Sequence, residues 1–326
     1  MDIALTQAIK ALIQGLGFDA CGVAQVKPLS STTDDTNPPS PAQIAYQRYL
    51  NWIAAGKQAK MDYLAKTTHL RGNPLSLLPD ARSIIVVLQN YFHTRKRVSH
   101  IAQYAWGRDY HEHMRYRLQI VADYLVRKGY SARIFADTAP ILEKAWAVEA
   151  GLGWIGKNTL LINRRLGSYT FIGGIITAAN LLVDKPFLED YCGTCQKCIE
   201  ACPTQALSPY ELDARRCIAY WTIEAPEMQE ESTSTHGWLF GCDICQQVCP
   251  WNRFARPQGE IALRPRPSTF WTSQQWKRLS NSQLKKVQER SALRRARPQK
   301  LKAIAQLLTS KQERSIIPLV NHPFNS

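Results

Sequence analysis

The sequence predicts an α/β domain over residues 1–183, a cysteine-rich module over 184–255 and a basic helical segment over 256–326. Three observations predict this division of the 326 residues. Apolar residues alternate between helical and strand spacing as far as about residue 178. Eight of the nine cysteines fall between Cys192 and Cys249. From Ile261 to Ser326 there are fourteen Lys or Arg and two acids, which gives 14 − 2 = +12 of the formal +15 charge.

The first part reads as helices and strands in alternation. Helical spacing is expected over 1–17, about 41–55, 61–64, 110–128 and 140–150, the last entered through Pro140. Strand patterns cover 18–26, 83–92, 130–136, about 159–162 and 169–178. The polar stretch Ser30–Pro41 is expected to be a mobile loop. Residues 83–92 form the clearest buried strand, and Asp137 comes directly after the strand at 130–136.

The cysteine-rich module contains the ligand run of bacterial ferredoxins. Cys192, Cys195, Cys198 and Cys202-Pro203 follow the spacing C-x₂-C-x₂-C-x₃-C-P, in which the fourth cysteine ligates a different cluster from the first three. This geometry requires a second run, and the chain supplies Cys242, Cys245 and Cys249-Pro250, with Cys217 upstream. The spacing therefore predicts two 4Fe–4S clusters. One is assigned to Cys192, Cys195, Cys198 and Cys249, and the other to Cys202, Cys217, Cys242 and Cys245.

Other uses of the cysteines fit less well. A zinc ribbon uses two C-x₂-C pairs and does not need the x₃-C-P ending. Disulfides need an oxidising compartment, and the N-terminus, from Met1, has no basic region followed by an apolar stretch. No apolar run approaches the length of a membrane span. We therefore expect a cytoplasmic protein without a membrane partner, in which Cys21 is a small core residue.

The basic segment predicts a polyanionic partner, most simply a nucleic acid, and the alternative is a solvated helical tail. Its strongest helical patterns lie at 291–296 and 301–308. His111 and His113 are expected to be polar residues at the start of a helix rather than metal ligands.

Several blocks of the chain resemble the epoxyqueuosine reductases, over about residues 3 to 305. The blocks are Tyr104–His111, Asp137–Lys144, Ala150–Asn158, Leu166–Ser168, Arg216–Glu224 and Phe240–Asn252.

The resemblance implies a cobalamin-binding α/β domain, to which the two clusters pass electrons. It implies reduction of the epoxide of epoxyqueuosine to the alkene of queuosine at the wobble position of tRNA. The proton donor would be Asp137, in the motif D-T-A-P, and family cobalamin contacts fall on Asn158, Leu161, Ser168 and Ile172. An external low-potential electron donor and a monomeric protein are also expected.

Asp137 permits two interpretations. Beside Phe135, Ala139 and Pro140 it could be desolvated and protonated near neutral pH, as a general acid requires. It could instead cap the helix expected from Pro140. Two other functions also remain open: a reductive dehalogenase using the same cofactors, and a two-cluster electron carrier without a substrate.

Overall fold

The computed structural model describes residues 1–29, 38–227 and 234–312, so most of the expected loop at Ser30–Pro41 lies outside the described residues. The first part is the expected mixed α/β fold. The strands are β1 Ala20–Gln25, β2 Ser83–Asn90, β3 Ala132–Phe135, β4 Trp154–Ile155, β5 Leu161–Ile162, β6 Thr170–Thr177, β7 Leu207–Ser208 and β8 Glu211–Leu212.

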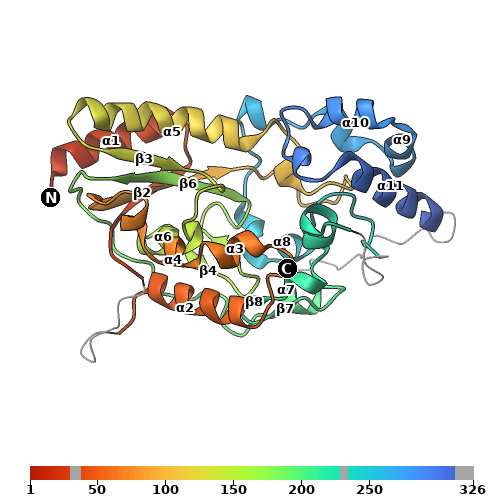
Figure 1. Ribbon diagram of the computed structural model, residues 1–326, viewed down its shortest axis with the longest axis horizontal. Coiled ribbons are helices and arrows are strands. Elements are labelled where there is room, and N and C mark those ends of the chain that lie inside the picture. Colours follow the sequence, from red (N-terminus) through yellow and green to blue (C-terminus); the bar gives the residue numbers. More distant parts are fainter. Residues whose placement is uncertain (30–37, 228–233, 313–326) are drawn as a thin grey trace.

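The helices of the first part surround the sheet, and further helices follow in the other two parts (Figure 1). They are α1 Ile3–Gly15, α2 Pro41–Ala54, α3 Asp62–Lys66, α4 Thr68–Gly72, α5 Tyr110–Arg127, α6 Glu143–Glu149, α7 Lys197–Glu200, α8 Ile244–Gln247, α9 Ser273–Arg278, α10 Asn281–Gln288 and α11 Pro298–Gln312. None of the helices formed by the described residues combines the length and apolar character needed to cross a bilayer.

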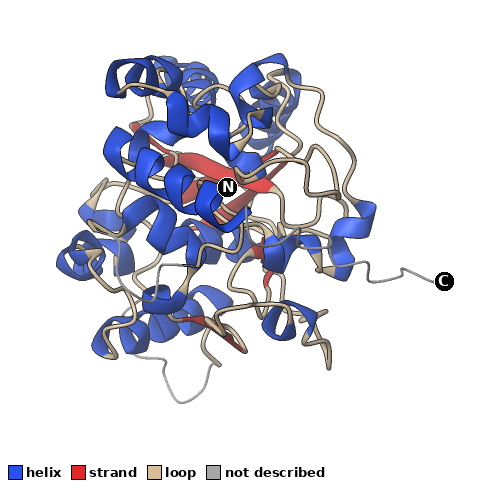
Figure 2. Ribbon diagram, turned by 90° about the vertical axis from the view of Figure 1, so that its right-hand side faces the viewer, coloured by secondary structure: helices blue, strands red, loops and turns tan. Residues whose placement is uncertain are grey.

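The central sheet has four strands in the order β1-β2-β6-β3, and every neighbouring pair is antiparallel. All eight residues of β2 are buried, because this central strand is covered on both faces. Successive side chains of a strand point to opposite faces, and accordingly Ile175 and Ile176 of β6 join two different apolar clusters. Helices α1 and α5 cover one face, and α6 lies against the other (Figures 1 and 2).

The C-terminal helices belong to the same core as the first face of the sheet. Leu284 of α10 and Leu301 and Ile304 of α11 share one apolar cluster with Met114 of α5 and Ile9 of α1. Each of these five side chains is fully buried. The basic segment is therefore packed into the fold through its apolar residues, while its charged residues line the outside.

Three expectations about local structure were wrong. Helix α6 begins at Glu143 rather than at Pro140, because the chain after β3 first makes two tight turns, from Thr138 N to Ala136 O and from Ile141 N to Ala139 O. The strand at 159–162 shrinks to β5, which pairs with β4 in a hairpin outside the main sheet. Residues 292–295 form a 3₁₀ turn, in which the Ser291 side chain accepts a hydrogen bond from Leu293 N.

Candidate active site and cluster-binding cysteines

The structure gathers the eight cysteines of the second part into two groups. Four of them line one cavity of about 200 Å³: Cys192, Cys195, Cys198 and Cys249. Cys202, Cys217 and Cys242 are close enough for their charges to act on one another, and Cys245 in turn is influenced by Cys242 and Cys217. This grouping follows the pairing predicted from the spacing, and the charge of Cys198 in the first group also acts on Cys245. Cys21 is half-buried in β1 and packs against the apolar core, away from both groups.

The two groups differ in their depth. Burial raises the pKa of thiols in both groups, and it raises that of Cys245, in the second group, well above its ordinary value. Cys217 and Cys242 of the second group also pack against a cluster of buried apolar side chains. Such thiols become thiolates when iron binds them, because the metal charge outweighs the cost of desolvation. The first group lies in an open cavity beside the exposed Thr194 and Gln196. The second group is therefore the deeper one.

Lys157 fixes the loop that carries the first group. Its side chain is buried, and Nζ donates hydrogen bonds to the carbonyl oxygens of Gly193, at 2.6 Å, and Cys195, at 3.0 Å. Through this ammonium group the α/β domain positions the loop between two cysteines. The lysine also places a positive charge beside thiolates that would carry negative charge.

Asp137 lies just beyond the end of β3, in a backbone conformation that few residues adopt. Its φ of +64° is in the left-handed region, which aspartate tolerates better than most side chains. It does not cap α6, whose N-cap residue is Leu142 and has no side-chain hydrogen bond. The expected apolar surroundings were also wrong, because the side chain of Asp137 is 59% exposed.

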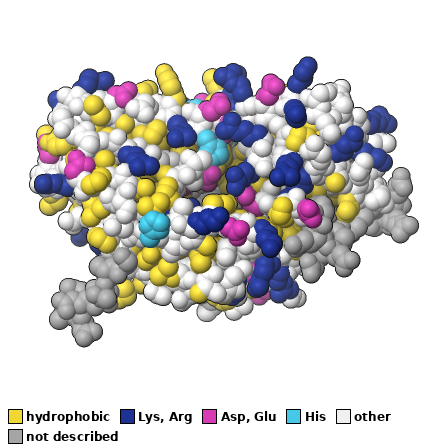
Figure 3. Space-filling view, viewed as in Figure 1, with side chains coloured by type: hydrophobic (Ala, Val, Ile, Leu, Met, Phe, Trp, Pro, Cys, Tyr) yellow, Lys and Arg dark blue, Asp and Glu magenta, His cyan; other side chains and the backbone are white. Residues whose placement is uncertain are grey.

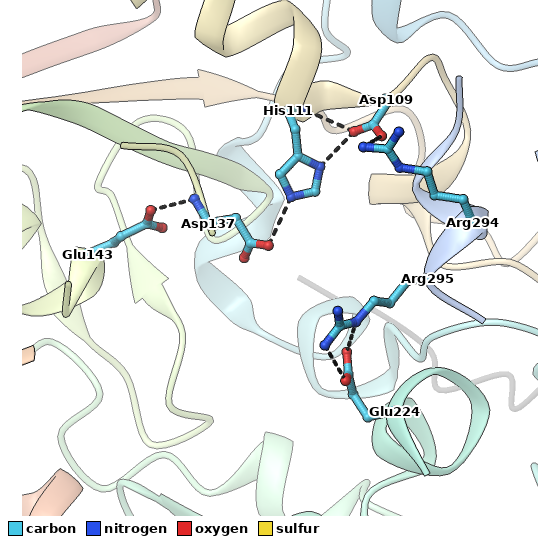
Figure 4. A network of polar contacts seen from close by, with 7 residues as sticks. All are labelled: Asp109, His111, Asp137, Glu143, Glu224, Arg294 and Arg295. Carbon is cyan, nitrogen blue, oxygen red and sulfur yellow. Dashed lines mark hydrogen bonds and ion pairs between the residues drawn. The ribbon is translucent and has the colours of Figure 1, made fainter. Parts of the chain in front are cut away.

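His111 joins Asp137 to the start of α5 (Figure 4). Its Nε2 lies 2.9 Å from Oδ2 of Asp137, and its Nδ1 lies 2.6 Å from Oδ1 of Asp109. Burial alone would lower the pKa of His111, but the hydrogen bonds and charges of the two carboxylates outweigh it and raise the pKa to about 9. The imidazole is therefore protonated at neutral pH, with a carboxylate on each side.

Asp109 is anchored by the third part of the chain. Its carboxylate is fully buried and forms an ion pair with Arg294, whose Nη2 lies 3.0 Å from Oδ2. The backbone N–H of Asp109 donates to Arg290 O, and that of Arg108 donates to Ala262 O. The C-terminal segment thus holds the residues that orient His111.

Glu143 supports Asp137 from the opposite side. Its Oε1 accepts a 2.6 Å hydrogen bond from the backbone N–H of Asp137. Burial, reinforced by the charge of Asp137, raises the pKa of Glu143 to about 8. The next residue, Lys144, donates to the carbonyl oxygen of Thr159 at 2.7 Å and so connects α6 to the loop before β5.

A second ion pair lies near this network, between Arg295 and Glu224 (Figure 4). It has two hydrogen bonds, of 2.8 and 2.7 Å, and the guanidinium also lies 5.6 Å from the ring centre of Tyr63. The charge of Asp137 acts on both Arg295 and Tyr63, so this ion pair lies at the same part of the surface as Asp137, which we call the opening at Asp137. The space-filling view shows basic side chains around a hollow in this face (Figure 3).

The four expected cobalamin contacts lie on β5, on β6 and in the segments just before these strands, and Asn158 also lines the cavity of the first cysteine group. Leu161 is buried in β5, and Ile172 is half-buried on β6. Ser168 is buried, and its hydroxyl contacts Gln246 and Asn252 at 3.0 Å. Asn158 is also buried, and its Nδ2 has no hydrogen-bond partner among the described residues.

Sequence reasoning missed the roles of His111 and Arg294. A signal for His111 was present, because Asp109 stands where an N-cap residue is expected and accepts a hydrogen bond from the backbone N–H of His111. No local pattern connects Arg294 to that position, since the two segments are far apart in the chain.

Two family models match the chain. One, described as "4Fe-4S double cluster binding domain", covers residues 191–252. The other, described as "Epoxyqueuosine reductase QueG, DUF1730", covers residues 71–138 and includes Asp137.

Relatives and solved structures agree with these matches. The chain is 37% identical over 304 residues to the epoxyqueuosine reductase of Leadbetterella byssophila, covering 91% of this chain and 96% of the relative. It is 40% identical over 296 residues to that of Synechocystis sp., covering 86% and 98%. A crystal structure of a selenomethionine-labelled epoxyqueuosine reductase superimposes with a TM-score of 0.81 at 26% identity, covering 94% of this chain and 81% of the other. Another, of an epoxyqueuosine reductase with a tRNA-Tyr epoxyqueuosine-modified stem loop, gives 0.80 at the same identity and coverage.

Proposed function

The chain belongs to the epoxyqueuosine reductases, and from this premise we propose that it converts epoxyqueuosine in tRNA to queuosine, with Asp137 as proton donor. The balanced reaction takes up two electrons and two protons, turns the epoxide into an alkene and releases water. The observation that carries the proposal is the Asp137–His111–Asp109 chain, which places the protonated His111 within 2.9 Å of an exposed carboxylate.

Residues of this chain also fit a cobalamin beside Asp137. The paired region of β3 and β6 ends at Phe135 opposite Gly174, and Asp137 follows two residues later, toward the end of β6 that carries Ile172. Thr170 lies on the same face as Ile172, because strand side chains alternate. Thr170 Oγ1 has no partner among the described residues, and neither has Nδ2 of Asn158, which lines the cavity of the outer cysteines. An apolar wall with unused polar atoms suits a flat corrinoid edged with amide groups.

A reduced cobalamin supplies an electron-rich nucleophile toward carbon, and the residues described here supply the proton. Asp137 is exposed and can reach a substrate oxygen, while the charged His111 lies 2.9 Å behind it. His111 can pass its proton from Nε2 to Oδ2 of Asp137, which in turn delivers it to the epoxide oxygen. Asp109 keeps the ring oriented, and the hydrogen bond to Glu143 keeps the Asp137 backbone in place.

The depth of the two cysteine groups suggests the order in which electrons travel. The group of Cys192 lies in an open cavity, whereas Cys217 and Cys242 of the other group pack against buried apolar side chains. Asp243, next to Cys242, accepts a hydrogen bond from the backbone N–H of Gln103 at 2.8 Å. The following residue, Tyr104, is influenced by the charges of both Asp137 and Asp243. Electrons would therefore enter at the outer cluster and leave from the inner one toward Asp137.

The structure changes what is expected of the basic segment in tRNA binding. Arg294 and Arg295 are ion-paired with Asp109 and Glu224, so their charges are partly neutralised within the protein. Arg297 is exposed, and no ion pair of its side chain is found among the described residues. We propose that the unpaired cations of this segment bind phosphates and that Arg294 positions Asp109. A monomer in the cytoplasm remains our expectation.

Arg297→Gln is expected to weaken tRNA binding in a salt-dependent way. Each phosphate contact releases about one counterion, so the slope of log affinity against log salt should fall by roughly one unit. Electrophoretic or fluorescence titrations of a tRNA at several salt concentrations measure this slope. The matched control is Arg127→Gln, which removes an exposed charge at the end of α5. Equal slopes in wild type and Arg297→Gln would show that Arg297 does not contact phosphate.

Activity is expected to fall as pH rises through about 9. The pKa of His111 is raised above its ordinary value of 6.5, so the folded protein holds this proton more tightly than the unfolded chain. The contribution of this proton to the free energy of unfolding is complete below about pH 6.5. It is lost as the pH rises through about 9, the pKa of His111 in the folded protein. Single-turnover rates measured between pH 6 and 10 should show this decline. The variant His111→Gln should have a lower rate that no longer declines near pH 9.

Glu143 has a pKa of about 8 and titrates in a neighbouring range. Glu143→Gln therefore separates the two groups, and the decline near pH 9 should persist in this variant. If the decline disappears in Glu143→Gln and remains in His111→Gln, Glu143 is the titrating group.

The reaction itself is tested with tRNA from a strain that lacks epoxyqueuosine reductase. The protein with its clusters and cobalamin is incubated with this tRNA and dithionite, and the nucleosides are analysed by mass spectrometry. Loss of one oxygen atom from epoxyqueuosine is the expected result. Unchanged epoxyqueuosine, with correct iron and cobalt content, would contradict the proposed function.

A further inference from the structure

The cavity of the outer cysteine group opens through an aromatic wall at the surface. Tyr191, Trp251 and Phe254 line it together with the four thiols. The ring centres of Trp251 lie 5.7 Å from Tyr191 and 6.0 Å from Phe254, so the three side chains form a continuous patch. Phe254 is 47% exposed, so part of this aromatic patch faces solvent.

Arginines surround this patch. The guanidinium of Arg164 lies 4.2 Å from the ring centre of Tyr191, and that of Arg253 lies 4.6 Å from the ring centre of Phe254. Arg95 donates a hydrogen bond to the backbone carbonyl of Arg253. All three arginines are exposed, and among the described residues no ion pair holds any of them. We call Arg95, Arg164, Arg253 and Phe254 the arginine rim.

The acid next to this cavity is already engaged within the protein. Asp190 accepts hydrogen bonds from the hydroxyl of Tyr210 and from the backbone N–H of Cys192. Its charge is therefore directed to the cysteine loop and does not neutralise the arginines. The rim presents net positive charge around an exposed aromatic centre, directly over the outer thiols.

The arginine rim is separate from the opening at Asp137. The rim arginines contact Tyr191, Phe254 and the backbone of Arg253, whereas the arginines that form ion pairs near Asp137 are Arg294 and Arg295. The substrate and the source of electrons can therefore bind at the same time.

We propose that the arginine rim docks an acidic electron-carrier protein that bears a flavin or iron–sulfur group at its surface. This inference rests on the proposed function, since a reductase needs a supply of electrons. In each encounter the reduced carrier loses one electron to the oxidised outer cluster, and two encounters supply the two electrons of one epoxide reduction. Complementary charge accelerates such short-lived encounters, and the exposed aromatic patch suits a small, weak interface.

The test uses the protein with both clusters and a reduced acidic flavodoxin as the probe. Stopped-flow absorbance measures cluster reduction without any tRNA, and calorimetry measures binding of oxidised flavodoxin. In wild type the rate should fall steeply with salt. In the variant Arg95→Glu/Arg164→Glu/Arg253→Glu it should be lower by roughly tenfold to a hundredfold at low salt. Binding of flavodoxin should weaken in parallel.

Three controls give each outcome a meaning. Reduction by dithionite, which needs no docking surface, should proceed at the wild-type rate, and Arg127→Glu should leave the flavodoxin rate unchanged. The inference would be overturned if flavodoxin reduced the clusters of wild type and of the triple variant at equal rates. It would also be overturned if the triple variant were slowed as much with dithionite as with flavodoxin. Weakened tRNA binding together with unchanged flavodoxin binding would overturn it as well, because the arginine rim would then be an RNA-binding surface. Normal cluster reduction without conversion of epoxyqueuosine would contradict the proposed function and leave the docking surface intact.

Discussion

Asp137→Asn is expected to lower single-turnover conversion of epoxyqueuosine by roughly 10²–10⁴-fold, the usual contribution of a general acid. Asparagine keeps the size of the side chain and can still contact His111, but it cannot pass a proton to the epoxide oxygen. Asparagine also tolerates the left-handed conformation found here at φ +64°, so the fold should be preserved. Rapid-quench measurement of queuosine in tRNA, at matched iron and cobalt content, determines the ratio.

The control for this substitution is tRNA binding, which should be unchanged because Asp137 supplies no phosphate contact. A rate close to that of wild type would remove Asp137 from the mechanism. A water molecule or a hydroxyl of the substrate would then be the proton source. The helix-cap interpretation no longer competes, since α6 begins after Leu142 and makes no contact with the Asp137 side chain at its N-cap.

Cys202→Ser is expected to remove the inner cluster and abolish turnover, while the outer cluster survives. The iron content should fall from about eight to about four atoms per chain, because the fourth cysteine of the run serves the other cluster. Iron analysis and electron paramagnetic resonance of the reduced protein measure this directly. The matched control is Cys21→Ser, which changes a thiol outside both groups and should leave the iron content unchanged.

This substitution also discriminates between the two ways of pairing the cysteines. If Cys202 served the cluster of its neighbours in sequence, the outer cluster would be lost instead. The cavity lined by Cys192, Cys195, Cys198 and Cys249 argues for the interlocked pairing.

The parts of the fold that could be predicted are those with a repeating apolar pattern. Strand β2 was visible because it is buried on both faces, and α5 because one face of a long helix is apolar. The β4–β5 hairpin has two residues in each strand, which is too short for any period to show. The late start of α6 could not be predicted either, because the two turns before it depend on local backbone hydrogen bonds.

The candidate site was predictable to the extent that its chemistry follows from local sequence. Cysteine spacing indicated the clusters, and a motif at a strand end indicated Asp137. The setting of Asp137 was wrong, because exposure and the bond to His111 are decided by which distant segments meet there. The ion pair between Arg294 and Asp109 could not be predicted for the same reason, because it joins two distant segments, the C-terminal segment and the start of α5.

That ion pair has a consequence for how the enzyme is made in the cell. Asp109 and His111 leave the ribosome well before Arg294, which belongs to the last part of the chain. Until Arg294 arrives, folding would bury the Asp109 carboxylate without this ion-pair partner, which is unfavourable. The segment before α5 is therefore expected to stay open during synthesis. The proton-holding chain at Asp137 becomes complete only after both cluster-binding runs have been translated, so a chain terminated early would lack an ordered site.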